Sequence, residues 1–283
     1  MTHRIPALMV ALANLLWASA SWAQGELPTR LREQFRAGVA AERAGNLEAA
    51  EKDFRRVLDQ GGDVAIVHHN LGTVYQQEGD HARAIGEFRE AIRRDPEFAA
   101  SHLLLGASLR ATHSLADAIR ELERAAQLAP EEPAVHLQLA GAYESAGRRV
   151  ESVQQYRTLS ALAPGDPEYQ YQLGQAYLRL SQWCVSEIRR LGPQSSRMYE
   201  TVAGALLAQG QTTRAIQFFQ RAAQADPQLP GIHLALAQIY LGLGHTDDAR
   251  REVTEELQLV PESVAAKSLL EQIESTNQKG PTK

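Results

Sequence analysis

The chain repeats a pattern of small, aromatic and proline residues every 34 positions. The stretch "LGTVYQQEGDHARAIGEFREAIRRDP", residues 71–96, carries this pattern at Gly72, Ala84, Phe88, Ala91 and Pro96. The same positions recur 34 residues later, at Gly106, Ala118, Leu122, Ala125 and Pro130. A fixed period of this length is typical of a chain built by stacking copies of one small unit.

Each period is predicted to form two α-helices joined by a turn. In the second period we expect a helix over 66–77, a turn at Gly79 and Asp80, and a helix over 81–94 that ends before Pro96. Alanine and leucine dominate the apolar residues, and both favour helix. The sequence therefore predicts an all-α fold.

One position of the first helix is always small. It holds Gly38, Gly72, Gly106, Ala140, Gly174, Ala203 and Ala237. Glycine inside a helix costs about 0.5–1 kcal/mol relative to alanine. Its regular return indicates close packing between the two helices of a pair.

The pattern resembles that of the tetratricopeptide repeat family, which combines L-G-x-x-Y, A-x-x-x-F and a closing proline in a 34-residue helix-turn-helix. The segments "NLGTVY", "LGASLR", "LAGAYE", "LGQAYL" and "LALAQIY" carry its first half. The resemblance implies a right-handed solenoid of about seven repeats, a capping helix over 264–275 and a disordered tail over 276–283. We place the repeats at 31–64, 65–98, 99–132, 133–166, 167–195, 196–229 and 230–263.

The fifth repeat, 167–195, is degenerate. It has 29 residues, and Ser186 and Arg190 stand where the second helix of the pattern has alanine and an aromatic residue. Two interpretations follow: a tolerated deletion, or a hinge that shapes a binding site.

The N-terminus is predicted to be a signal peptide over 1–23, followed by a short linker over 24–30. Arg4 precedes an apolar run over 5–17, and Ser21 and Ala23 are typical of a cleavage site. The alternative is an uncleaved anchor at the membrane interface. We expect a periplasmic or secreted protein with no membrane span after cleavage, and its only cysteine, Cys184, excludes an internal disulfide.

The residues do not indicate chemistry. The net charge is −5 with acids and bases interspersed, so a nucleic-acid partner is not expected. Nucleophile, phosphate-binding and zinc-protease motifs are absent from the sequence. Four histidines share one repeat position, and we interpret them as packing residues because they fall on separate helix pairs: His68, His102, His136 and His233. We therefore predict no enzyme activity, no cofactor and no metal.

The resemblance implies that first helices line an inner groove that binds a ligand. Carried over position by position, the candidate groove residues are Asn70, Thr73, Gln77, Leu103, Arg110, Gln138, Tyr171, Gln172, Gln175, Arg179 and Gln238. Their amides would hydrogen-bond an extended peptide backbone, while Tyr171 and Leu103 would give apolar contact. The family's carboxylate clamp for a chain terminus is not supported, because Phe35 and Val39 occupy its first two positions.

The predicted function is a non-enzymatic scaffold that binds a protein or peptide segment in this groove, within an extracytoplasmic assembly. The alternative is a self-associating structural module of the cell envelope, in which terminal repeats stack between chains. An exposed apolar end would favour self-association, whereas a polar cap would favour ligand binding.

Overall fold

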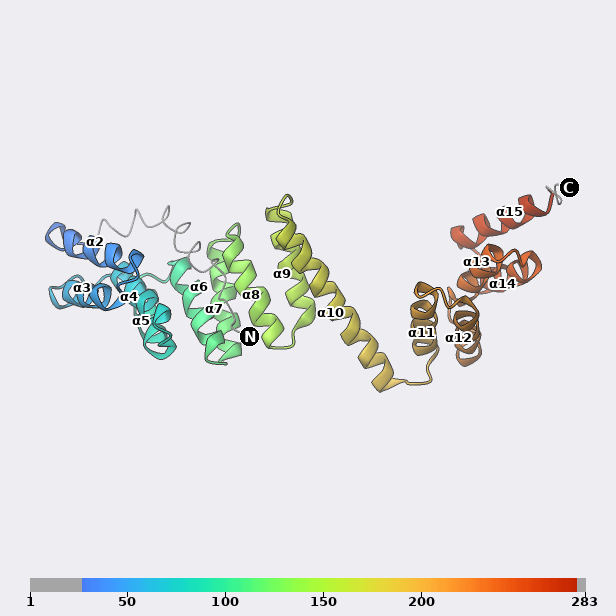
Figure 1. Cartoon of the computed structure of the whole chain (residues 1–283), viewed down its shortest axis with the longest axis horizontal. Helices are drawn as coiled ribbons and strands as arrows, with labels where there is room; N and C mark the ends of the chain where they lie inside the picture. The colour runs from blue at the N-terminus through green and yellow to red at the C-terminus, as the bar shows by residue number, and fades with distance from the viewer. Residues whose placement is uncertain (1–26, 279–283) are drawn as a thin grey trace. The chain divides into compact units, whose positions relative to one another are not determined.

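The computed structural model describes residues 27–278, and within this range it contains fourteen α-helices and no strand (Figure 1). The chain divides into two compact units, residues 1–180 and 181–283. The first unit holds α2 (Thr29–Arg43), α3 (Leu47–Asp59), α4 (Ala65–Gln77), α5 (His81–Arg94), α6 (Ala99–Ala111), α7 (Leu115–Leu128), α8 (Pro133–Ser145), α9 (Arg149–Leu162) and most of α10 (Pro167–Leu191). The second holds the end of α10, α11 (Ser196–Ala208), α12 (Thr212–Ala225), α13 (Ile232–Gly242), α14 (Thr246–Leu259) and α15 (Val264–Gln278). The predicted all-α repeat fold is confirmed.

Local sequence features determine where the helices of each pair begin and end. In the second repeat α4 ends before Gly79, which takes the left-handed conformation at φ 81°, a backbone state that glycine adopts without strain. Asp80 then caps α5, because its carboxylate accepts a hydrogen bond from the Arg83 amide at 3.0 Å. The helix ends two residues before Pro96, which lacks the amide hydrogen needed to continue it.

The small residue of the first helix lies where the two helices of a pair pack closely, as its spacing predicts. A Cβ atom built on Gly72 would lie 2.8 Å from the ring of the fully buried Phe88, on the second helix of the same repeat. Gly38 meets Phe54 in the same way. The absent side chain therefore permits the close approach of each helix pair.

The second unit has its own core. Phe219 and Ile232 pack with Leu236 and Ala237, and α15 adds the fully buried Ile273 to the same cluster. The sequence places a closing helix over 264–275, and α15 extends three residues further, to Gln278.

The fifth repeat corrects the prediction of a helix-turn-helix over 167–195, because α10 runs as one helix of 25 residues. Ser181 stands at the repeat position where Gly45, Gly79, Gly147, Gly210 and Gly244 adopt a positive φ. His113 adopts φ 62° at this position in the third repeat, so the glycine is favoured rather than required. Because this glycine is missing and the repeat is five residues shorter than a full one, the chain continues the helix and does not turn.

Residues 1–23, the predicted signal peptide, lie outside the described residues, as do 24–26 of the predicted linker and 279–283 of the predicted tail. Those predictions stay untested. Of the helices that the structure does describe, none combines the length and apolar character needed to cross a membrane.

Candidate binding surface

The first helices of consecutive repeats lie side by side in the first unit. α2 contacts α4, α4 contacts α6, and α6 contacts α8, so equivalent residues of these helices form rows (Figure 1). We call this layer, with the start of α10, the first-helix face. It is the surface on which the sequence places the candidate groove.

Polar side chains bridge neighbouring helices on this face. Gln77 donates its amide hydrogen to the Glu42 carboxylate at 2.9 Å, linking α4 to α2. Arg110 donates to the Gln138 oxygen at 3.1 Å, linking α6 to α8. Arg179 pairs with Glu144 and links α10 to α8. Four of the eleven candidate residues are therefore joined across repeats: Gln77, Arg110, Gln138 and Arg179.

Two further residues, Gln76 and Glu42, lie on the first-helix face in the row of bridging side chains but are not among the candidate residues. Gln76 donates to the Ser108 hydroxyl at 2.8 Å and so bridges α4 and α6. Burial raises the pKa of Glu42 to about 7, against the opposing effects of its hydrogen bond from Gln77 and the charge of Arg43. Both residues share the repeat position of Arg110 and Glu144, and this periodicity was the signal that could have identified them.

Other candidates are hydrogen-bonded within their own helix. Asn70 donates to the Ile66 carbonyl at 2.7 Å, and Thr73 donates to the His69 carbonyl at 2.9 Å. Gln172 donates to the Glu168 carboxylate at 2.6 Å on the exposed side of α10. Gln238 is exposed on α13 and belongs to the second unit, so it is not part of the face described here.

Leu103 is a correction to the candidate groove. Its exposed fraction is 1%, and it packs in a core cluster with Val135 and Leu139 of the next repeat. This position faces the following repeat, not a ligand. Tyr171 has the same repeat position but is 59% exposed, since no repeat stacks beside it in the first unit.

The shared histidines connect the two helices of their own repeats. His68 Nδ1 lies 2.6 Å from Glu87, and His102 Nδ1 lies 2.8 Å from Glu121, each 19 residues further along the chain. His136 pairs in the same way with Gln155, and His233 with Glu252. Within residues 27–278 no group of three histidine, cysteine or acidic side chains is arranged to hold a metal ion.

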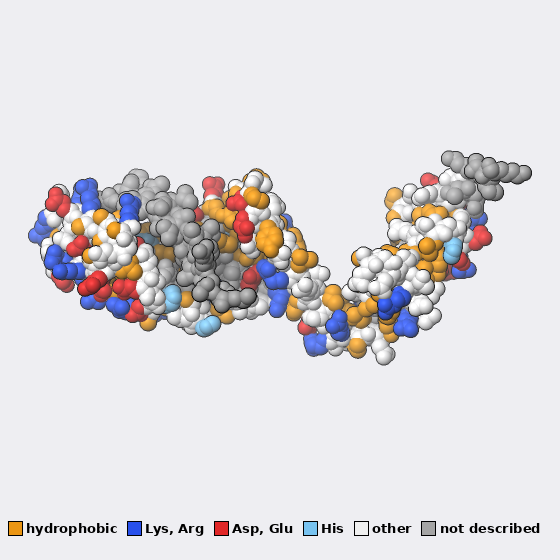
Figure 2. All heavy atoms as spheres, in the orientation of Figure 1, with side chains coloured by type: hydrophobic (Ala, Val, Ile, Leu, Met, Phe, Trp, Pro, Cys, Tyr) orange, Lys and Arg blue, Asp and Glu red, His pale blue; other side chains and the backbone are white. Residues whose placement is uncertain are grey.

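Arginine and carboxylate charges alternate on the face. Glu42, Arg110, Glu144 and Arg179 follow one another from α2 to α10. Figure 2 also shows basic and acidic side chains intermixed at the N-terminal end of the described chain, around α2 to α5. Such a surface is suited to a polar, weakly charged ligand and not to a polyanion.

Comparisons with known proteins agree with the repeat structure. A tetratricopeptide repeat model matches residues 109–176 and 206–276, and a second tetratricopeptide repeat model matches residues 69–133. No curated protein matches the chain.

Several solved structures resemble the chain at low identity. A tetratricopeptide repeat protein from Parabacteroides merdae is 13% identical with a TM-score of 0.49, and the match covers 87% of this chain and 100% of that one. PilF of Pseudomonas aeruginosa is 18% identical with a TM-score of 0.47, covering 86% of this chain and 97% of that one. The MamA protein is 18% identical with a TM-score of 0.46, covering 70% and 92%. From the two family models and the repeated helix pairs together, the chain belongs to the tetratricopeptide repeat family.

Proposed function

We propose that the chain is an interaction scaffold that binds an extended peptide segment along the first-helix face of its first unit. Tetratricopeptide repeats are protein-protein interaction modules, and the family is generally non-catalytic. The segment-binding site and its ligand are the new elements of this proposal.

The observation that carries the proposal is the series of polar bridges between consecutive first helices. Arg179 and Glu144 are surface side chains, and Gln77 is exposed beside the half-buried Glu42. The exposed ion pair contributes only about 0–1 kcal/mol, so a ligand can replace it at little cost. An extended backbone presents one donor and one acceptor per residue, which matches amide and guanidinium groups spaced along a row.

The charges of the bridges favour a particular ligand chemistry. The two carboxylates on the row, Glu42 and Glu144, are matched in number by two guanidinium groups, Arg110 and Arg179, so the row has no excess of either sign. Gln175, which lies one turn before Arg179 on α10, adds an amide for which no hydrogen bond is found among the described residues. A neutral or mixed-charge peptide is therefore the best ligand, bound mainly through its backbone.

We also propose that this scaffold acts outside the cytoplasm. The support is the sequence of residues 1–23, with a basic start, an apolar run too short to span a membrane and small residues before the expected cut. The assembly that it serves would then be periplasmic or secreted.

A displayed library of random peptides tests the binding site even though the natural partner is not identified. Peptides selected on the wild-type chain are measured against Gln77→Ala/Arg179→Ala, which removes two surface residues of the row. Loss of one neutral and one charged hydrogen bond corresponds to at least about tenfold weaker binding. The helical circular dichroism signal should not change, because both side chains are exposed.

The matched control is Arg124→Ala/Gln127→Ala. It removes the same two residue types from α7, a second helix outside the first-helix face, where Arg124 donates to Gln127 at 3.3 Å. Binding that survives the change on the row, or that falls equally in the control, would overturn the proposed site.

A further inference from the structure

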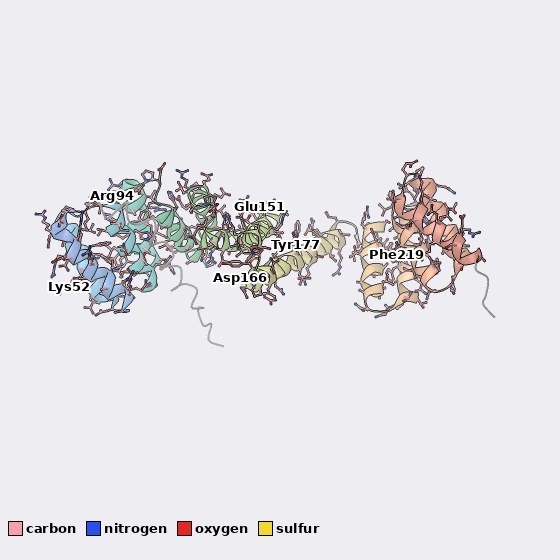
Figure 3. The ribbon with its side chains drawn as sticks, turned by 90° about the horizontal axis from the view of Figure 1, so that it is seen from above. Lys52, Arg94, Glu151, Asp166, Tyr177 and Phe219 are labelled. Carbon is pink, nitrogen blue, oxygen red and sulfur yellow. The ribbon has the colours of Figure 1, made fainter. Side chains whose placement is uncertain are left out.

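The fifth repeat keeps the residues of a first helix but has no second helix packed on it. A Cβ atom on Gly174 would meet nothing within 4 Å, although the equivalent atom on Gly72 would lie 2.8 Å from Phe88. Tyr177 is 48% exposed, whereas Tyr75 at the same repeat position is 2% exposed (Figure 3). This side of α10 is built for contact with a helix that the first unit does not supply.

This side continues along α10 as a regular series that we call the α10 stripe: Tyr171, Gly174, Leu178, Ser181, Val185 and Ile188. The first four members are exposed, and the last two are half-buried. The spacing between its members is 3, 4, 3, 4 and 3 residues, which is the heptad spacing of a helix that packs along another helix. Tyr171 and Leu178 are 59% and 56% exposed, and Figure 2 shows hydrophobic side chains at the surface along α10.

The stripe is separate from the side of α10 that is already packed. Leu173 and Ala176, with Tyr169 and Leu180, join the core cluster formed by α8 and α9. Those residues are also spaced by 4, 3 and 4 but are displaced around the helix from the stripe. α10 thus carries two apolar sides: one is packed in the core, and the other, the stripe, is exposed at its first four members and half-buried at its last two.

We propose that the α10 stripe binds the α10 stripe of a second copy of this chain in an antiparallel helix pair. In antiparallel coiled coils the two heptad core positions face each other across the seam. The register that aligns the stripe sets Tyr171 opposite Ile188, Gly174 opposite Val185, and Leu178 opposite Ser181 of the second copy. The arrangement has two-fold symmetry, so each contact occurs twice and the interface closes after two chains.

Side-chain size supports this direction over the parallel one. In the antiparallel register both small residues face a branched aliphatic residue: Gly174 faces Val185 and Ser181 faces Leu178. In a parallel pair Gly174 would face Gly174 and leave a void. Tyr171 would face Tyr171, and the two rings would crowd each other. Uniform packing density therefore favours the antiparallel pair.

Charge supports a second copy as the occupant. The six stripe residues are uncharged, and Arg189 is the only charged side chain among the residues that flank the seam, Gln170, Gln175, Tyr177, Gln182, Cys184 and Arg189. The symmetric register brings Arg189 to Gln175 of the second copy, and Tyr177 and Gln182 to their own counterparts. No two like charges meet, so the surface is complementary to itself.

Analytical ultracentrifugation of the purified chain tests the proposal. The wild type should change from monomer to dimer between about 1 µM and 1 mM, the range between moderate and weak affinity. Leu178→Arg places a charge in the seam and should weaken dimerisation at least about tenfold. The fold should be retained because Leu178 is exposed in the single chain. Leu207→Arg, at an exposed leucine on α11, is the matched control and should dimerise like the wild type.

A pair of charge variants tests the register. Leu178→Glu and Ser181→Lys should each weaken the homodimer, and mixing the two should restore a dimer because the introduced carboxylate and ammonium groups then face each other across the seam. A wild type that remains monomeric, or a Leu178→Arg dimer as strong as the wild type, overturns the proposal. A dimer lost through Leu207→Arg alone, or a mixture that fails to associate, also overturns it. The proposal is also overturned if the wild type stays monomeric and its stripe binds a helix of another protein.

Discussion

Three glycine-to-alanine substitutions separate a packed helix side from an open one. Gly72 and Gly174 occupy the same repeat position, but only Gly72 has an aromatic ring against it, with ring carbons of Phe88 at 2.8 Å from the position that a Cβ atom would take. Gly86 lies on α5 with nothing within 4 Å of its Cβ position and serves as the control. All three substitutions gain about 0.5–1 kcal/mol of helix propensity.

Because this gain is common to the three variants, their differences isolate the packing cost. Phe88 is fully buried and cannot move away, so Gly72→Ala should lose about 1–3 kcal/mol relative to the other two. Gly174→Ala and Gly86→Ala should both stabilise the chain slightly. Urea denaturation followed by circular dichroism, at a concentration where the chain is monomeric, gives the three free energies of unfolding. If Gly174→Ala is as destabilising as Gly72→Ala, a helix does pack on α10 and our description of the fifth repeat fails.

Three further predictions concern titration and processing. Since the pKa of Glu42 rises from 4.5 to about 7 on folding, its carboxylate costs stability at high pH, and Glu42→Gln should stabilise the chain by about 1–3 kcal/mol near pH 8 and little near pH 4 in urea denaturation. Burial lowers the pKa of His68, but hydrogen bonds to Glu87 and Asp63 outweigh it and raise the pKa above 6.5. The stability that His68 adds over His68→Gln should therefore be full below about pH 6.5 and decline as pH rises; a constant difference would contradict this sign. Intact-mass measurement of the exported chain should show a cut after Ala23, and a mass that retains residues 1–23 would refute the signal peptide.

The repeat architecture follows from the sequence because its signals are local. Within one repeat, Gly79 permits the turn, Asp80 caps the next helix and Pro96 prevents its continuation. The resulting helix α5 has the predicted bounds His81–Arg94. The first-helix bounds differ by one residue, as α4 begins at Ala65. The same local chemistry explains the continuous α10, because Ser181 stands at the glycine position of the turn. The segment matches the repeat over its first helix and lacks the alanine and aromatic residue of the second, which indicates an irregular repeat but not the loss of the turn.

The surface is less predictable because exposure depends on neighbouring repeats. Leu103 and Tyr171 share one repeat position, yet the first is buried by the next repeat and the second is open. The bridge between Gln77 and Glu42 likewise joins residues 35 positions apart, and its geometry depends on how two repeats stack. A position within the repeat therefore identifies a side chain's direction but not what lies in front of it.

The loss of a second helix after α10 links the two proposals, and their principal residues lie on different sides of the helix. Full burial of a large apolar side chain contributes about 1.5–3 kcal/mol, and Tyr171, Tyr177 and Leu178, each about half exposed, lack roughly half of it in the single chain. Arg179 is the next residue, but one residue turns the helix by about 100°, which places its side chain on the row with Glu144 and off the stripe. A helix pair through the stripe therefore leaves Gln77, Arg179 and their partners open, while Gln175 borders both surfaces. It follows that Leu178→Arg should weaken the dimer at least about tenfold while single-site peptide affinity stays intact. The Gln77→Ala/Arg179→Ala change should do the reverse, so either proposal can fail without the other.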